Sequence, residues 1–326
     1  MRLIVKSLAA GMEDEIAEFE NRAALALGNC YAEPVSGSEA RAWFSSDEVK
    51  PEEFALALLD GRIAGYAWAW IREGDSTLSF TGLKVDPLLP ADYALGVARA
   101  LLSWARLSLE EWQGARGVVS IQLGLFGGWL MELLKRLLPG LEEFRVSSIL
   151  MRLEDPGVLS RGGVVEELNP AVDREDAAIV SRIYNDAFSR YEAFIAWSED
   201  DVEEYYREKA RRHPVIVLMA RRGGEPAGFV EVYPYTSICG EKIGYVSLLA
   251  VAGRHQGRGI GTLLLAEGVR RLEKHGVRET ILHALPEVAR LYYKLGFRPV
   301  RWYVKSRIPI GYLPGNIPSM ETLNAS

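Results

Sequence analysis

The sequence predicts an α/β protein in which helices cover a mixed sheet and the whole arrangement occurs twice. The chain has 326 residues, more than one typical domain of roughly 100–200 residues holds. Hydrophobic residues make up 48% of it and charged residues 25%, the balance of a soluble protein with a proper core. Segments of the same character recur in the same order roughly 150–166 residues apart, far longer than a solenoid repeat. Two copies of one domain are therefore expected.

The first copy is predicted from alternating and helical patterns. Each copy has a turn, an Ala-Gly pair, an aromatic residue and then a period-two alternation, which is typical of a strand. A second strand-like run, a long helical pattern, another strand, a shorter helix and a last strand follow. The expected elements are strands at 60–70, 76–85, 117–125 and 144–153, and helices at 94–112 and 128–140.

The second copy repeats this order and has further elements before it. The helix expected to begin after Ser198 has a Ser N-cap and acidic residues in its first turn, both of which stabilise a helix start. Two glycines at 223–224 turn one strand into the next. The expected elements are strands at 164–168, 215–222, 223–233, 242–251, 279–285 and 300–308, and helices at 173–188, 198–212, 261–276 and 286–297.

The boundary between the copies is expected within residues 154–163, which are rich in Gly, Pro and charge. The predicted domains are residues 1–155 and 163–310. Residues 311–326 form a tail rich in Pro and Gly, which either wraps over a domain or is disordered.

Composition and charge exclude several classes of protein. The net charge of −6 and the pI near 5.5 argue against a surface built for nucleic acid. No apolar run reaches the ~18–20 residues of a membrane span, and the first residues turn acidic too early for a signal peptide. No His/Asp/Glu cluster has the spacing of a metal site. We therefore expect a cytoplasmic protein without a metal, and no nucleic-acid or membrane partner.

Residues 248–265 are the most informative stretch, because an apolar strand ends there in a basic, glycine-rich loop before a helix begins. Such a loop directs backbone N–H groups at an anion, and glycines let a phosphate approach the backbone. Arg254 and Arg258 add positive charge. A Walker A loop is excluded because the lysine is missing, and the spacing G-x-G-x-G does not fit the dinucleotide pattern.

The loop resembles the acyl-CoA pyrophosphate motif of the GNAT superfamily of N-acetyltransferases, Q/R-x-x-G-x-G/A, at residues 256–261. The preceding strand ends at Val251, four residues before Gln256, and residues 289–297 resemble the family's A-x-x-LY-x-K-x-GF ending. The resemblance covers about residues 163–305 by motifs and about residues 1–153 by pattern only. Tandem arrangements with one worn copy are known in this superfamily, mycothiol synthase being an example.

The first copy is expected to keep the fold without the CoA site. Counted from Val85 as from Val251, the positions of Gln256, Gly259 and Gly261 fall at three residues that form no glycine loop: Pro90, Tyr93 and Leu95. Such a copy would either wall off the substrate cleft of its partner or serve a purely structural purpose.

The resemblance implies that the second copy moves an acetyl group from acetyl-CoA to a primary amine by direct transfer in a ternary complex. The end of the strand at 249–251 would bind the pantetheine and polarise the thioester, and the loop would hold the pyrophosphate. The residues implied for acetyl-CoA are Leu249, Ala250, Val251, Gln256, Gly257, Arg258, Gly259, Ile260, Gly261 and Thr262. Tyr292 would protonate the CoA thiolate, the alternative being that Tyr292 or the adjacent Tyr293 only packs.

The chain departs from the family at two polar positions, one of which usually supplies the general base. Many members have Glu where this chain has Tyr245, and Asn where it has Leu285. Glu231 and His283, both in apolar strands, are the candidate substitutes. For each, a structural place in the sheet is the competing interpretation. His255 is expected to touch CoA or solvent.

The acceptor is open between a small-molecule amine and a peptide or protein amine. The acidic helix at 198–206 would favour a cationic acceptor, or it is only a solvated helix face. A rival hypothesis is a protein that binds acyl-CoA without turnover, as a sensor or assembly module. The missing Glu and Asn favour this rival, and the presence of Tyr292 opposes it.

Overall fold

The computed structural model describes residues 2–8, 11–44, 53–72, 78–113, 118–124, 127–138, 140–141, 143–159, 165–168, 173–191 and 194–315. The chain forms two compact units. Unit 1 comprises Met1–Ser147 and Trp302–Ser326, and unit 2 comprises Ser148–Arg301. Within the described ranges, no helix is both long enough and apolar enough to cross a membrane.

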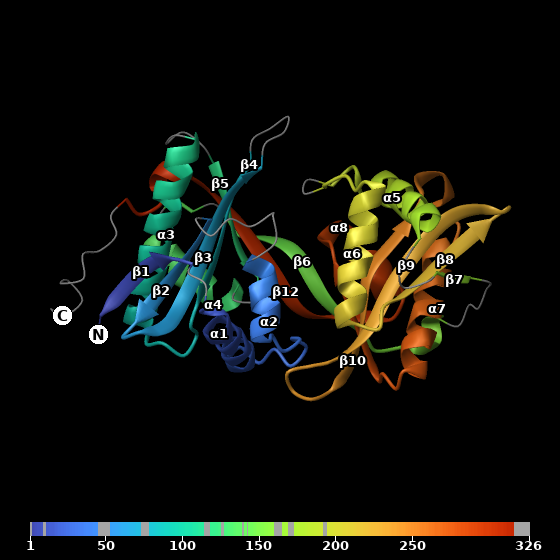
Figure 1. The fold of residues 1–326 in the computed structure, drawn as a ribbon, viewed down its shortest axis with the longest axis horizontal. Helices are drawn as coiled ribbons and strands as arrows, with labels where there is room; N and C mark the ends of the chain where they lie inside the picture. The colour runs from blue at the N-terminus through green and yellow to red at the C-terminus, as the bar shows by residue number, and fades with distance from the viewer. Residues whose placement is uncertain are drawn as a thin grey trace. The chain divides into compact units, whose positions relative to one another are not determined.

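Unit 1 is a mixed sheet with helices on both faces (Figure 1). Its strands run in the order β1-β2-β3-β4-β5, followed by the later part of β12. Phe19 of α1 packs edge-on against Tyr66 of β3 at a ring distance of 5.8 Å, while Val97 of α3 covers the neighbouring Gly65. Adjacent strand residues face opposite sides, so α1 and α3 lie on opposite faces of the sheet. The elements of this unit are β1 (Leu3–Ser7), α1 (Glu13–Ala26), α2 (Gly37–Phe44), β2 (Phe54–Leu59), β3 (Arg62–Arg72), β4 (Leu78–Val85), α3 (Ala91–Gln113), β5 (Val118–Gly124) and α4 (Gly127–Leu137), with β6 (Arg145–Leu153) at its end.

Unit 2 has the same kind of sheet, with its strands in the order β7-β8-β9-β10-β11, followed by the later part of β6. Only β10 and β11 run parallel among these pairs. The predicted order of strands and helices is present, and the α/β class with a mixed sheet is confirmed. The elements are β7 (Glu166–Leu168), α5 (Arg174–Phe188), α6 (Glu199–Arg212), β8 (Ile216–Arg222), β9 (Glu225–Thr236), β10 (Lys242–Val251), α7 (Ile260–Lys274), β11 (Glu279–Ala284), α8 (Pro286–Lys294) and β12 (Phe297–Pro309).

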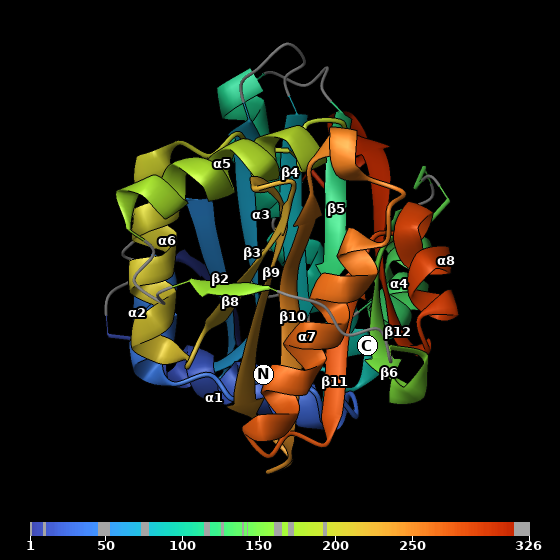
Figure 2. The same ribbon diagram turned by 90° about the vertical axis from the view of Figure 1, so that its right-hand side faces the viewer.

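The sheet of unit 2 separates two hydrophobic cores. Val230 and Val232 of β9 pack with α7 in one core. Phe229 and Tyr233 of the same strand pack with α5 and α6 in the other. This alternation places α5 and α6 on one face and α7 on the opposite face, as Figures 1 and 2 show.

The two units repeat each other at the level of single backbone contacts. Gly65 pairs with Val85 at the end of β4, and Gly228 pairs with Val251 at the end of β10. A Cβ on Gly65 would lie 2.5 Å from a carbonyl oxygen of the next strand, and a Cβ on Gly228 would lie 2.6 Å from the corresponding oxygen. Only glycine fits either position, because a Cβ cannot approach backbone that closely.

The long strands β6 and β12 each continue from one unit into the other. Residues 149–152 of β6 pair with β11, whereas residues 304–309 of β12 pair with β5. Ile310, the last residue of the predicted second domain, and Leu313 of the predicted tail are buried in the core of unit 1. Arg106 of α3 donates hydrogen bonds to the carbonyl oxygens of the same segment. The compact units therefore follow strand pairing, and their limits differ from the predicted domain boundaries at 155, 163 and 310. Residues 316–326 of the tail lie outside the described residues.

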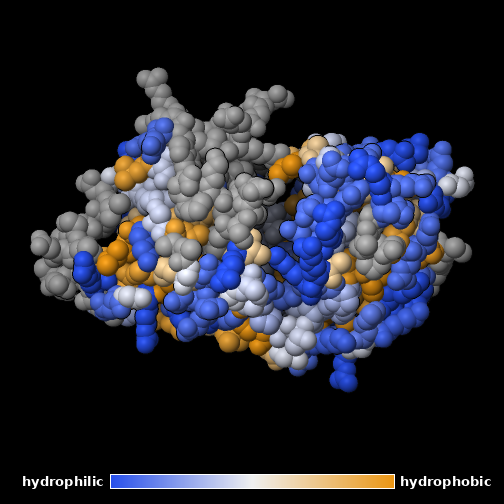
Figure 3. All heavy atoms as spheres, viewed as in Figure 1, coloured by the Kyte–Doolittle hydropathy of each residue, from blue (hydrophilic) through white to orange (hydrophobic). Residues whose placement is uncertain are grey.

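Helix α6 has the predicted start. The Ser198 hydroxyl accepts from the Asp201 N–H, and the Asp201 carboxylate accepts from the Ser198 N–H, which forms a capping box. These bonds from Ser198 lower the pKa of Asp201. Arg174 forms ion pairs with the acidic residues Glu199, Asp200 and Glu203. Figure 3 shows a hydrophilic surface over this region, so these acids form a solvated helix face whose charge is partly matched by Arg174.

Candidate active site

Strand β10 separates from its parallel neighbour β11 halfway along its length. The two strands pair from Ile243 to Val246, whose partner is Leu282. Beyond this point β10 continues to Val251 and pairs only with β9. The backbone groups of residues 247–251 that point away from β9 therefore have no strand partner.

A β-bulge lies where the two strands separate. Val246 pairs with Val232 of β9, but the next paired residue, Leu248, lies opposite Glu231. Ser247 is thus an additional residue without an opposite partner. A bulge of this kind increases the local twist and redirects side chains.

The glycine loop joins β10 to α7. Gly257 and Gly259 have φ angles of 71° and 80°, in the left-handed region that favours glycine. Gly259 is the N-cap of α7, so the first N–H groups of this 15-residue helix have no acceptor within the helix. The Gln256 side chain donates to the carbonyl oxygen of Val251 at 3.0 Å and thereby ties the loop to the end of the strand.

The other loop residues differ in what they offer to an anion. A Cβ on Gly261 would make only an ordinary contact with Val251, so backbone geometry alone does not require this glycine. Arg254 pairs with Glu225 at 3.0 Å, which partly offsets its charge. Arg258 is exposed. The Nε2 atom of His255 is buried and has no hydrogen-bond partner within the described ranges.

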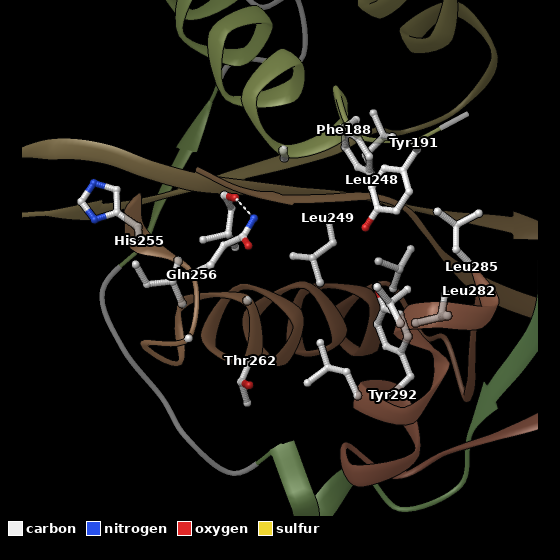
Figure 4. Close-up of a pocket in the computed structure, with 18 of the residues that line it drawn as sticks. Phe188, Tyr191, Leu248, Leu249, His255, Gln256, Thr262, Leu282, Leu285 and Tyr292 are labelled. Carbon is white, nitrogen blue, oxygen red and sulfur yellow. Dashed lines mark hydrogen bonds between the residues drawn. The ribbon is translucent and has the colours of Figure 1, made fainter. Parts of the chain in front are cut away.

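A cavity of about 420 Å³ runs from the glycine loop along the unpaired part of β10 to α8. Figure 4 shows His255, Gln256 and Thr262 at one end and Tyr191, Leu285 and Tyr292 at the other. Its lining comes from six parts of unit 2: the end of α5 and the residues after it, β10, the glycine loop, the start of α7, the end of β11 and α8.

Ten of the thirteen residues predicted for the site line this cavity. They are Leu249, Val251, Gln256, Gly257, Gly259, Ile260, Gly261, Thr262, His283 and Tyr292. Ala250 is buried on the opposite side of β10, in the core formed with α5 and α6. Arg258 and Glu231 are also absent from the lining. In the part of the chain that is described, no three His, Cys, Asp or Glu side chains are grouped so that they could hold a metal ion.

The two adjacent tyrosines of α8 have different surroundings. Tyr292 lines the cavity and packs edge-on against Phe297 at 5.9 Å, whereas Tyr293 is 39% exposed and does not line it. Burial and the nearby Tyr191 raise the pKa of Tyr292 to about 12. Its phenol is therefore protonated at neutral pH and can donate a hydrogen bond or a proton.

His283 lies at the end of β11, just beyond the last residue that pairs with β10. The His283 side chain lines the cavity, and this is where its exposed surface lies. The surrounding protein nevertheless removes most of the water from around the ring. This burial lowers its pKa to about 4. His283 is therefore neutral at physiological pH. Its ring packs edge-on against Tyr245 at 6.0 Å, at the position where many family members have Glu.

Glu231 is completely buried beneath α6, on the face of the sheet that α5 and α6 cover. One of its oxygens accepts from the Lys209 ammonium and from the Tyr205 hydroxyl, while the other has no partner within the described ranges. Burial and the Glu231 charge raise the pKa of Tyr205 and of the adjacent Tyr206. Glu231 thus belongs to a buried polar cluster and does not itself line the cavity.

The sequence alone did not indicate the contribution of the segment after α5. Phe188 and Tyr191 line the cavity, and Tyr191 directs its hydroxyl into it (Figure 4). The Arg190 guanidinium lies over the Tyr191 ring at 5.3 Å. In the sequence this segment shows only several aromatic residues after a helix. Such a pattern does not distinguish residues that line a site from residues that pack in a core.

The corresponding corner of unit 1 has a shorter loop. The first helical hydrogen bond of α3 is accepted by Pro90, and that of α7 by Gly259. Four residues, 86–89, precede Pro90, whereas seven residues, 252–258, precede Gly259. Counting from the strand end therefore misplaced Pro90, Tyr93 and Leu95, because it allowed for no deletion. Residues 86–89, between Val85 and Pro90, contain no glycine.

Known proteins resemble this chain in two ways: a family model matches part of its sequence, and solved structures match its fold. Residues 179–297 match the family model described as acetyltransferase (GNAT) family. No curated protein matches. A solved GCN5-related N-acetyltransferase from Sphaerobacter thermophilus is 20% identical, with a TM-score of 0.66 over 95% of this chain and 96% of its own. A tandem GNAT protein from the clavulanic acid biosynthesis pathway is 17% identical, with a TM-score of 0.68 over 95% and 99%.

These two likenesses cover nearly the whole chain and confirm the tandem GNAT fold, whereas the sequence match falls on the unit that contains the cavity. In sequence, residues 179–297 are therefore similar to the GNAT acetyltransferase family, whose members move an acyl group from acyl-CoA to an amine.

Proposed function

We propose that unit 2 transfers an acetyl group from acetyl-CoA to a primary amine by direct attack in a ternary complex. The observation that carries this proposal is the continuous cavity that joins the glycine loop, the unpaired part of β10 and Tyr292. A phosphate site, a row of free backbone groups and a proton donor then lie in the order in which acetyl-CoA presents its pyrophosphate, pantetheine and thioester.

The pyrophosphate would lie at the start of α7. The residues available for it are Gln256, Gly257, Arg258, Gly259, Ile260, Gly261 and Thr262. The positive φ angles of two glycines leave the backbone open to an anion, and the helix dipole adds partial positive charge. The residues present therefore fit a bound pyrophosphate.

The pantetheine and thioester would run along Leu249, Ala250 and Val251. Backbone N–H groups of this segment that point away from β9 can donate to the thioester carbonyl oxygen. One such donor is worth roughly 10²–10³ in kcat when it faces the oxygen that gains charge in the transition state.

The chemical step forms a C–N bond and breaks a C–S bond. The neutral amine attacks the thioester carbonyl carbon, the oxygen gains negative charge, and the collapse of this intermediate expels the CoA thiolate. Tyr292 would give its proton to that sulfur.

The amine must lose a proton in the same sequence. His283 lines the cavity and is neutral, so it can accept the proton directly or through a water molecule. Glu231 could receive it only indirectly, because Lys209 and Ser247 lie between its carboxylate and the cavity. The acceptor would be a small-molecule amine or a peptide or protein amine.

The test is incubation of the protein with acetyl-CoA and a panel of amines, with release of free CoA thiol as the readout. Binding of acetyl-CoA is measured separately by calorimetry. We expect micromolar to millimolar KM values typical of enzymes and release above buffer background with at least one amine. Tight binding with background release for every amine would instead identify a non-catalytic acyl-CoA-binding protein.

A further inference from the structure

The bulge residue Ser247 is connected to a buried ion pair that lies beneath α6. The Lys209 ammonium donates to the Ser247 hydroxyl oxygen at 2.8 Å, and also to Glu231 and to the Tyr205 hydroxyl. It lies 4.9 Å from the centre of the Tyr233 ring as well. The Lys209 side chain is 13% exposed and that of Glu231 is 0% exposed. An ion pair buried this deeply is costly to desolvate, and the three hydrogen bonds of Lys209 offset part of that cost, while one Glu231 oxygen has no partner within the described ranges.

The direction of these hydrogen bonds is fixed by chemistry. An ammonium has three donors and no acceptor, and the three contacts of Lys209 use all three donors. Ser247 must therefore accept from Lys209, which leaves its own hydrogen for another acceptor. The Tyr205 oxygen accepts from Lys209 and is also a hydrogen-bond partner of Ser247. Ser247 lines the cavity as well, so its hydrogen can turn from the Tyr205 oxygen to an oxygen bound in the cavity.

An ammonium bound to a hydroxyl oxygen makes that hydroxyl a stronger donor and a weaker acceptor, because successive hydrogen bonds polarise one another. Such a hydroxyl suits an oxygen that becomes negative better than an amine that must lose a proton. Ser247 lies at the start of the unpaired segment of β10, beside the backbone groups expected to face the thioester.

We propose that the Ser247 hydroxyl is a catalytic hydrogen-bond donor to the thioester carbonyl oxygen and that Lys209 and Glu231 polarise and position it. The inference rests on the proposed acetyl transfer. As the amine nitrogen bonds to the carbonyl carbon, the oxygen gains the electron pair of the C=O bond and Ser247 donates a hydrogen bond to it without losing its proton. The pair returns when the C–S bond breaks. Glu231 then acts through Lys209 and does not receive the proton of the amine.

The first test compares Ser247→Ala with Ser247→Thr, which restores a hydroxyl at the same position. Ser247→Ala should lower kcat roughly 10²–10³-fold with little change in the acetyl-CoA dissociation constant, and Ser247→Thr should recover most of the loss. Ser181→Ala is the matched control, because Ser181 is a buried serine of the same unit that donates to the Trp197 carbonyl oxygen outside the cavity. Unchanged kcat in Ser247→Ala would overturn the proposal.

The ion pair is tested by the double variant Lys209→Met with Glu231→Leu. Replacing a buried pair by apolar residues of similar volume avoids an unpaired charge and usually preserves folding, which circular dichroism checks. We expect a folded protein with kcat reduced at least about tenfold, one polarising contact having been lost. A folded double variant with the kcat of the unaltered protein would show that the pair is only structural.

A second readout needs no turnover. Acetyl-CoA labelled with ¹³C at the thioester carbonyl should show a downfield shift on binding, and this shift should be smaller in Ser247→Ala. Equal shifts in the two proteins would overturn the role of Ser247 while leaving the proposed function intact. Failure of the unaltered protein to bind acetyl-CoA would overturn the proposed function, and the role of Ser247 with it.

Discussion

The two units have the same backbone arrangement at the end of their fourth strand, β4 in unit 1 and β10 in unit 2. They differ in the loop that leads from this strand to the next helix. The Cα of Val85 and the Cα of Val251 lie at the same distance, 3.2 Å, from the positions that a Cβ on Gly65 and on Gly228 would occupy. The residue after each strand then donates its N–H back to the preceding strand, from Asp86 to Ala64 and from Ala252 to Ala227. The local scaffold is therefore the same in both units.

The two loops differ in the backbone that they offer to an anion. In unit 1 the buried Asp86 carboxylate pairs with Arg22 at 2.8 Å and accepts from the Leu88 N–H at 2.9 Å. A negative charge thus occupies the corner at which a phosphate would have to bind, and the short loop ends at a proline. In unit 2 the loop has two glycines with positive φ angles and no carboxylate of its own, and the Asp186 carboxylate of α5 accepts from the Gly253 N–H at the start of the loop, at 2.6 Å.

The strands before these loops differ as well. β3 and β4 pair in one continuous register, and the Trp68 ring packs directly over Gly82. β9 and β10 have the bulge at Ser247, and the cavity begins beside it. Unit 1 therefore has the same strand-to-helix framework with a continuous β3/β4 register and a loop three residues shorter.

The largest expected effect comes from Tyr292. The corresponding helix of unit 1, α4, contains no tyrosine. Tyr292→Phe should lower kcat roughly 10²–10⁴-fold, the usual worth of a general acid, with little change in binding of acetyl-CoA. Tyr293→Phe is the matched control, since Tyr293 is the exposed neighbour on the same helix. Steady-state kinetics of both variants decide the point. Equal losses in the two variants would contradict the assignment of Tyr292.

The glycine loop is tested by giving it a side chain. Gly259→Ala should weaken binding of acetyl-CoA at least about tenfold, because charge-assisted hydrogen bonds of roughly 1.5–3 kcal/mol are disturbed. Gly240→Ala is the control: this glycine has a φ of 83° and open space around it, as Gly259 does, but it lies outside the cavity. Both variants should lose about 1–2 kcal/mol of unfolding free energy through left-handed strain. Calorimetric binding separates them, and equal affinities would contradict a phosphate site in the loop.

A substitution in unit 1 tests the corner without a glycine loop. Asp86→Ala removes a buried carboxylate and its contacts with Arg22 and the Leu88 N–H, and should lower the free energy of unfolding by about 1–3 kcal/mol in denaturant titrations. The affinity for acetyl-CoA should not change, since the cavity belongs to unit 2. A gain of a second acetyl-CoA equivalent in Asp86→Ala would show that the carboxylate alone closes the site of unit 1.

The smallest effect is the pH dependence from His283. Its folded pKa of about 4 lies below the ordinary value of 6.5, because burial disfavours the charged ring. Folding therefore favours the neutral form, so this contribution to stability is complete above about pH 6.5 and is lost as the pH falls toward 4. The histidine NMR signal that disappears in His283→Gln should titrate near pH 4 in the unaltered protein. A midpoint near 6.5 would contradict the enclosed position of the ring.

The parts of the fold that depend on neighbouring residues were predictable. Alternation predicted the strands, and Ser198 with Asp201 predicted the start of α6, because caps are satisfied within one turn. The glycines predicted the loop, because a positive φ at Gly257 and Gly259 restricts those positions to residues that tolerate it. The cavity-lining position of Tyr292, distinct from that of Tyr293, needed the structure, since adjacent helical residues differ only in direction.

The sequence by itself determined the two copies, the phosphate-type loop and the family motif, because each of these depends on residue types and spacings within short segments of the chain. Only the tertiary structure decided that β6 and β12 continue between units, that three residues are missing from the first loop, and that Glu231 is bound to Lys209 outside the cavity. These features depend on which side chains meet after folding. Residues 209, 231 and 247 are far apart in the chain, and no local pattern indicates their contact.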